Sequence, residues 1–197
     1  MTSMVVSLTK GAVVELDKGV DKVRLDLSWG PNKTSGAAFD LDVSVFLTNA
    51  ANKVTQATDF VFYNNLCSTG NAVVHSGDEK TGSAVGVDES VTVNFALLPT
   101  YVENVHFIVT IHDAKMRKQN FGAMEDSQVS VYNETDVSGA KAPQMYQLEM
   151  GYSNSTDTAV RVCSFMKKNG KWYYRNVSAG SQEGLEFFAK EYGLTVA

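Results

Sequence analysis

The chain has 197 residues, with 17 basic against 22 acidic side chains and a net charge of −5. This length suits one domain, residues 1–197, with a substantial buried core. The acidic balance offers no basic field for nucleic acid. No apolar run approaches the ~20 residues of a membrane span, so direct membrane insertion is not expected. The start, MTSMVVSLTKGAVV, lacks the features of a signal peptide, which favours a cytoplasmic protein.

Short segments in which apolar and polar residues alternate predict roughly ten strands. Asn169-Gly170 lies between two of them and is typical of a hairpin turn. Residues 112–122 predict a short helical turn with a solvated basic face. The expected strands cover residues 5–9, 13–16, 23–29, 39–47, 60–63, 91–97, 105–111, 129–132, 145–150, 159–166 and 172–177.

One longer helix is expected at the C-terminal end of the chain. Leu185, Phe188, Ala189 and Tyr192 recur at helical spacing, so these side chains are predicted to be core. Ser181 is a candidate cap for its start, and Gly193 for its end. The sequence therefore predicts a mainly antiparallel, all-β sandwich with short helical turns and a C-terminal helix.

Acidic residues are concentrated in one stretch of the chain. Residues 36–90 contain seven acidic and two basic side chains, so the remainder is balanced. In the segment FDLDVSVFL, Asp40 and Asp42 alternate with apolar residues, which predicts a half-buried strand with both carboxylates on one face, roughly 7 Å apart. A glycine-punctuated acidic loop, residues 77–89, follows later. Such mixtures of carboxylate and carbonyl oxygens suit a hard cation, although isolated acids at a solvated surface are a common alternative.

Other kinds of site find less support. The Asp40-x-Asp42 run is not an EF-hand, because Val45 replaces the required glycine and Ala51 the bidentate glutamate. No nucleophile elbow, phosphate-binding loop or dinucleotide fingerprint is present. Asp40 and Asp42 could serve acid/base chemistry, but nothing in the sequence raises the pKa of one above the other. No enzyme is therefore predicted.

The cysteines and histidines suggest no metal site of their own. Cys67 and Cys163 have no metal-ligand or redox spacing and are expected to be reduced, partly buried thiols, with a disulfide as the alternative. His75, His106 and His112 are too scattered to nominate zinc and are expected to be structural.

Seven motifs together resemble the TerD family of tellurium-resistance and stress proteins. Their order and spacing match from about residue 5 to residue 193, and they read FDLDVSVFL, DFVFYNN, HSGDEKTG, GVDES, VTIHDA, FG and NGKWYYR. The resemblance implies a calcium-binding β-sandwich of the bacterial cytoplasm, made by operons for tellurite, phage and colicin resistance. It also implies association with other proteins of that system, membrane-bound ones included.

The family's ligand motifs map onto this chain by position. Val87 departs from the pattern, because it replaces an acid, whereas Glu79 adds one where the family has a neutral residue. Six carboxylates around one divalent ion would leave a large negative excess, which favours two calcium ions. The implied metal residues are Asp40, Asp42, Asn64, Asn65, Asp78, Glu79, Gly86, Asp88 and Glu89.

The function expected is that of a calcium-binding, non-enzymatic binding or scaffold protein in tellurite resistance and stress response. One alternative is a calcium-dependent adhesion or sugar-binding module, which exposed aromatic residues and a secretion signal would favour. Another is a calcium-triggered membrane-binding module, which would need basic or apolar loop tips. Residues 76, 81, 83 and 84 of the acidic loop are instead small and mostly polar.

Overall fold

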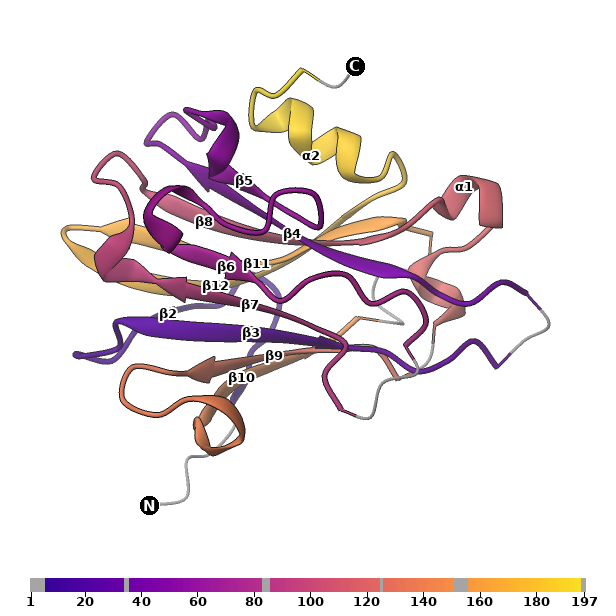
Figure 1. Ribbon diagram of the computed structural model, residues 1–197, viewed down its shortest axis with the longest axis horizontal. Coiled ribbons are helices and arrows are strands. Elements are labelled where there is room, and N and C mark those ends of the chain that lie inside the picture. Colours follow the sequence, from indigo (N-terminus) through magenta and orange to yellow (C-terminus); the bar gives the residue numbers. More distant parts are fainter. Residues whose placement is uncertain (1–5, 34–35, 83–85, 125, 151–155, 196–197) are drawn as a thin grey trace.

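A computed structural model describes residues 6–33, 36–82, 86–124, 126–150 and 156–195. Val5, at the start of the first expected strand, and loop residues 34, 35, 83 and 84 lie outside the described residues. Within them, twelve strands form two six-stranded sheets (Figure 1). Sheet one has the order β1 (Val6–Ser7), β10 (Gln144–Glu149), β9 (Gln128–Asn133), β3 (Lys22–Ser28), β7 (Glu89–Asn94) and β6 (Val73–His75). Sheet two has the order β2 (Val13–Glu15), β12 (Lys171–Ser181), β11 (Ala159–Lys168), β8 (Asn104–Ile111), β4 (Leu41–Thr48) and β5 (Phe60–Val61).

Neighbouring strands run antiparallel, apart from β1, which pairs in parallel with β10. The predicted antiparallel β-sandwich is thus confirmed. The predicted turn at Asn169-Gly170 joins β11 to β12, and both residues adopt the positive φ that such turns require. The helices are α1 (Ala114–Arg117) and α2 (Leu185–Glu191). Single 3₁₀ turns cover Ala57–Asp59, Thr69–Asn71, Phe95–Leu97, Phe121–Ala123 and Gly139–Lys141.

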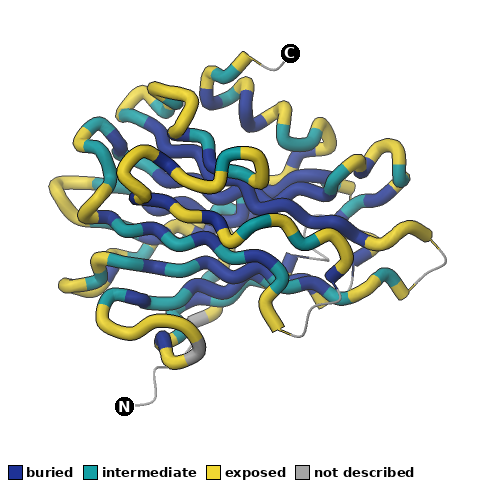
Figure 2. The backbone as a smooth tube through the Cα atoms, viewed as in Figure 1, coloured by how far each residue is buried: buried dark blue, intermediate teal, exposed yellow. Residues whose placement is uncertain are grey.

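The main core lies between the two sheets. Alternate residues of the long central strands point into it, which the period-two pattern predicted. From sheet one come Val23, Leu25 and Leu27 of β3, and from sheet two come Val105, Phe107 and Val109 of β8. Figure 2 shows that buried residues lie mainly in the strands and exposed residues mainly in the loops around them.

A second, smaller core covers the outer face of sheet two. Phe188 of α2 and Tyr192, which directly follows the helix, pack there against Phe46 of β4 and Ile108 of β8, and α2 lies over this face (Figure 1). All eight residues of β4 are consequently buried. The expectation of a half-buried strand was wrong, because the sequence pattern does not reveal that a distant helix covers the second face.

Three local expectations also differ from the structure. β6 was not predicted, since its three residues are too short for a periodic pattern. Ser181 does not cap α2, because β12 continues through it and pairs it with Ala159; Gly184 precedes the helix instead. The basic face of residues 112–122 is not simply solvated, because Arg117 forms an ion pair with Asp40 at 3.3 Å.

Replacing Phe188 by alanine should lower the free energy of unfolding by about 3–5 kcal/mol, because its buried ring leaves a cavity on sheet two. Replacing the adjacent Phe187, which is 40% exposed, should cost much less. Urea denaturation of both variants measures the difference. Equal losses of unfolding free energy in the two variants would mean that Phe188 does not anchor α2 to sheet two.

Candidate metal centre

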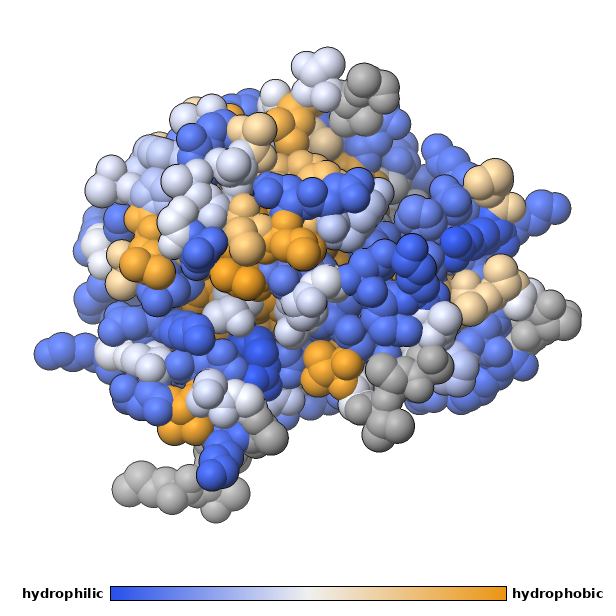
Figure 3. Space-filling model, in the orientation of Figure 1, coloured by the Kyte–Doolittle hydropathy of each residue, from blue (hydrophilic) through white to orange (hydrophobic). Residues whose placement is uncertain are grey.

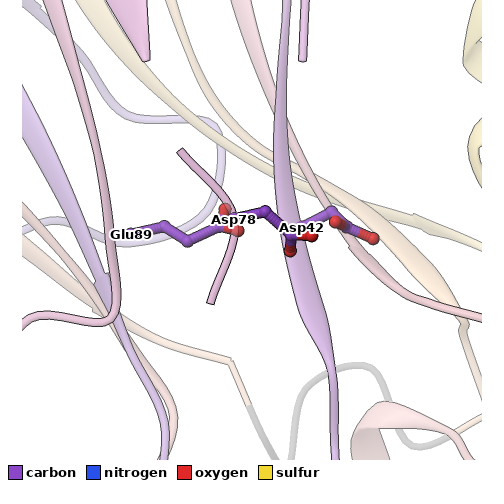
Figure 4. A group of neighbouring side chains, drawn as sticks. All are labelled: Asp42, Asp78 and Glu89. Atoms are coloured by element: carbon purple, nitrogen blue, oxygen red, sulfur yellow. The ribbon is translucent and has the colours of Figure 1, made fainter. Parts of the chain in front are cut away.

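Three acidic side chains from separate segments converge where the edges of the two sheets meet. Asp42 lies on β4, Asp78 on the acidic loop and Glu89 at the start of β7. Each offers a carboxylate oxygen, and the three oxygens lie within 4.8 Å of one another. Figure 4 shows the three side chains close together, each from a different segment. Oxygens that bind one calcium ion at about 2.3–2.6 Å are at most about 5 Å apart, so this spacing fits a shared cation.

Glu89 is the most enclosed of the three, with 1% of its surface exposed. Its Oε2 accepts a hydrogen bond of 2.8 Å from the Val43 amide of β4. Its Oε1 is also buried but has no hydrogen-bond partner among the described residues. A buried carboxylate oxygen without a partner is costly, and a bound cation would supply the missing interaction.

Burial and the neighbouring carboxylates perturb the acidity of the cluster. Burial, followed by the negative charges of Glu89 and Asp40, raises the pKa of Asp42 to about 7. Burial also raises the pKa of Glu89, although interactions with His75 and with the Val43 and Glu79 backbone oppose the shift. The sequence had offered no reason for any carboxylate here to have a raised pKa; the tertiary structure supplies one.

Residues around the cluster line a hollow of about 70 Å³. Lys80 contacts Asp78 with its ammonium group at 3.3 Å, and His112 contacts Asp42 through Nδ1 at 3.6 Å. The backbone amide of His112 donates a hydrogen bond to the Asp40 carbonyl, which sets the ring beside the acids. The lining consists of Asp40, Asp42, Tyr63, Asp78, Lys80 and His112.

Two of the predicted ligands have other hydrogen-bond partners. Glu79 accepts bonds from Thr81 and from the Gly82 amide, and these bonds outweigh burial and lower its pKa below the ordinary value. Asp88 accepts a bond of 2.9 Å from the Trp29 amide, which ties the start of β7 to the end of β3. Neither carboxylate belongs to the converging group of three.

The remaining predicted ligands, Asn64, Asn65 and Gly86, lie in nearby turns and loops. The Asn65 side chain donates a hydrogen bond of 2.6 Å to the Phe60 carbonyl, whereas Asn64 is exposed. Neither lines the hollow. Gly86 is exposed with φ of 109°, a conformation that favours glycine. Gly82 has φ of 60°, and a Cβ there would lie 2.4 Å from the Trp29 ring, so this loop position also requires glycine.

A larger groove of about 490 Å³ adjoins the hollow and shares Asp42, Tyr63 and His112 with it. The groove lies between α1 and the start of α2, whose residues Met116 and Leu185 contribute apolar surface. In Figure 3 hydrophilic residues predominate on the side of the molecule that carries α1. Because they share Asp42, Tyr63 and His112, the hollow and the groove form one continuous surface.

His106 and the two cysteines largely match the expectations from the sequence. His106 is buried and bonded to Ser164 and Asn52, and burial lowers its pKa to about 3, so its structural role is confirmed. Both cysteines are free thiols. Cys163 is buried, but Cys67 is exposed rather than partly buried. Burial raises the pKa of the Cys163 thiol, which makes it a poor nucleophile.

The two packed sheets and the acidic cluster define a β-sandwich with a candidate cation centre at one sheet edge. A model of the TerD domain matches residues 4–192. The chain therefore belongs to the TerD family, as its motifs predicted.

Relatives match along almost the whole chain. The chain is 39% identical over 197 residues to general stress protein 16U of Bacillus subtilis, covering 98% of this chain and 100% of the relative. It is 34% identical over 197 residues to tellurium resistance protein TerD of Serratia marcescens, with the same coverage of 98% and 100%. A crystal structure described as a homologue of telluride resistance protein (TerD) from Streptomyces coelicolor aligns with a TM-score of 0.73 at 19% identity, covering 90% of this chain and all of that one.

Without calcium, stability should fall as pH rises from about 4 to about 7. The folded chain holds a proton on Asp42 up to a pKa of about 7, whereas the unfolded chain loses it near 3.8, so the unfolded state binds fewer protons in this window. The Asp42→Asn variant should lack this component, which is about 4 kcal/mol at most for a pKa raised from 3.8 to about 7. Urea denaturation in chelator at several pH values measures it. If the free energy of unfolding changed with pH in the same way in both proteins, the raised pKa of Asp42 would be contradicted.

Proposed function

We propose that this protein is a calcium-binding, non-enzymatic binding or scaffold protein that acts in tellurite resistance and stress response. The resistance and stress roles are suggested by the names of its relatives in Serratia marcescens and Bacillus subtilis. Calcium binding is supported by one observation above all. Asp42, Asp78 and Glu89 converge within 4.8 Å around a buried Glu89 oxygen that lacks a hydrogen-bond partner in the described part of the chain.

The donor set favours calcium over other metals. The three converging ligands are carboxylates, which hard cations prefer, and calcium accepts irregular sets of six to eight oxygens. Magnesium demands a tighter octahedron and retains its waters. The sequence had suggested that no histidine could join the ligands, but His112 lies 3.6 Å from Asp42. One nitrogen beside three carboxylates still falls short of a typical zinc set.

A second calcium ion is part of the proposal. Asp40 lines the hollow beside Asp42 and Asp78, and Asp88 precedes Glu89, so one divalent charge leaves a negative excess. Arg117 and Lys80 offset part of that excess in the calcium-free protein. The number of ions bound per chain, measured by calorimetry, distinguishes one site from two.

The two cavities suit different occupants. The hollow of about 70 Å³ suits an ion with its waters, whereas the adjoining groove of about 490 Å³ is large enough for a small molecule or for part of a binding partner. We place the protein in the cytoplasm, with other tellurium-resistance proteins as partners, some of them at the membrane. Among the described residues, no helix is long and apolar enough to cross a membrane.

Millimolar calcium should raise the melting temperature, because an ion that binds only the folded state stabilises it. A hundredfold excess over Kd contributes about 2.7 kcal/mol, which corresponds to roughly 5–10 °C for a domain near this size. Asp42→Asn should remove most of this increment, since it deletes a ligand charge and keeps the shape.

Glu15→Gln is the matched control, because Glu15 is an exposed acid on β2, at the opposite edge of sheet two. This variant should retain the full calcium response. Equal melting temperatures of the parent protein in chelator and in calcium would contradict calcium binding. A larger stabilisation by zinc at equal concentration would instead identify a different metal.

Neither thiol should be needed for tellurite resistance, because Cys67 and Cys163 are unpaired and a redox enzyme would need an activated thiol or a cofactor. Cells that produce Cys67→Ser or Cys163→Ser protein should survive tellurite as well as cells with the parent protein. Loss of resistance with unchanged calcium binding and melting temperature would contradict the non-enzymatic role.

A further inference from the structure

We propose that His75 is the positioning residue of the calcium centre: one imidazole ring holds the segments that carry all three converging carboxylates. This inference rests on the proposed calcium site. His75 ends β6 and is 4% exposed. The positioning role is inferred from the contacts of the imidazole ring, and His75 is not proposed as a metal ligand.

Both ring nitrogens bind the backbone of segments that carry metal ligands. Nε2 lies 3.1 Å from the carbonyl oxygen of Val43, the residue after Asp42. Nδ1 lies 3.0 Å from the amide nitrogen of Gly77, the residue before Asp78. The ring thus spans from β4 of sheet two to the acidic loop that leaves sheet one.

These contacts define the tautomer. The Gly77 N–H can only donate, so Nδ1 must accept and carries no proton. Nε2 therefore carries the proton of the neutral ring and donates it to the Val43 carbonyl. Because both nitrogens are used, the orientation of the ring about its own axis is determined.

The third proposed ligand, Glu89, is also held through Val43. The Val43 amide donates to Glu89 Oε2 at 2.8 Å, while the Val43 carbonyl accepts from His75. His75 Nε2 also lies 3.5 Å from Glu89 Oε2. With Oε2 occupied in this way, Oε1 is the oxygen left without a partner and available to a cation.

A purely structural histidine would behave differently, and this chain contains one for comparison. His106 is similarly buried and satisfied, by Ser164 and Asn52, and its ring stacks on Tyr192. It lies in the α2 side of sheet two and contacts none of the three carboxylates. Replacing His106 should reduce stability without changing the calcium site.

The test compares calcium affinity with stability in His75→Ala, His75→Gln, His75→Asn and His106→Gln. Each protein is first melted in chelator, and calcium is then titrated by calorimetry at a temperature where all are folded. His75→Ala should bind calcium about 10–100-fold more weakly, the usual effect of losing a residue that orients metal ligands. His75→Gln can retain the donor to Val43 and His75→Asn the acceptor for Gly77, so each should recover part of the affinity. His106→Gln should melt earlier yet bind calcium like the parent protein.

The outcomes separate this inference from the proposed function. If the parent protein binds no calcium, the calcium site and the role of His75 both fail. If the parent binds and the His75 variants bind equally well, only the positioning role fails. An equal loss of affinity in His106→Gln would also overturn it, because general destabilisation would then explain the effect.

A measurement on the parent protein covers the case in which the His75 variants do not fold. Nitrogen NMR of the histidine rings at neutral pH should show His75 with a proton on Nε2 and none on Nδ1. The opposite tautomer, or a ring that exchanges between tautomers, would overturn the proposal, because the Gly77 amide would then lack its acceptor.

Discussion

Near the edge of sheet two, side chains from sheet one form hydrogen bonds with the backbone of β4. Among the described residues, β5 pairs with β4 only at Val45 and Phe46, so the edge of β4 at Val43 extends beyond that pairing. Val43 is buried, and unpaired peptide groups there would be costly. Glu89 and His75 bind its amide and carbonyl, respectively. The same bonds that satisfy the strand edge therefore join the two sheets and bring the carboxylates together.

The cost of this arrangement is electrostatic. Carboxylates from β4, β7 and the acidic loop lie close together, and those of Asp42 and Glu89 are buried. Burial raises the pKa of both, and repulsion by neighbouring carboxylates adds to the shift of Asp42. Lys80, His112 and Arg117 contact the cluster with groups that are cationic or able to become so. They approach it from the solvent side, where their charges are screened. A divalent ion held between Asp42, Asp78 and Glu89 would act at shorter range and would also bind the unpartnered Glu89 oxygen.

The rest of sheet two provides a rigid support for this edge. Helix α2 buries the outer face of β4 through Phe188 and Tyr192. From Phe46, stacked rings continue through Phe60 and Phe62, at centroid distances of 4.4 Å in both pairs, and then to Tyr63. Tyr63 lines both the hollow and the adjoining groove. Contiguous side chains thus connect the packed helix to the candidate cation centre, the last of them from the turn that follows β5.

The sequence by itself determined the sandwich, most of its strands, the terminal helix and the acidic character of one region, because period-two and helical patterns are local properties of the chain. It also placed Asp42, Asp78 and Glu89 among the ligands through the motifs. It could not separate them from Glu79 and Asp88, whose carboxylates bind loop and strand amides. His75 and His112 looked like ordinary structural histidines, since the contacts that set them beside the acids, with Val43 and Asp42 respectively, join residues distant in the chain. Only the tertiary structure decided that β4 is covered on both faces and that two sheet edges meet at Val43, because both follow from packing between segments distant in sequence.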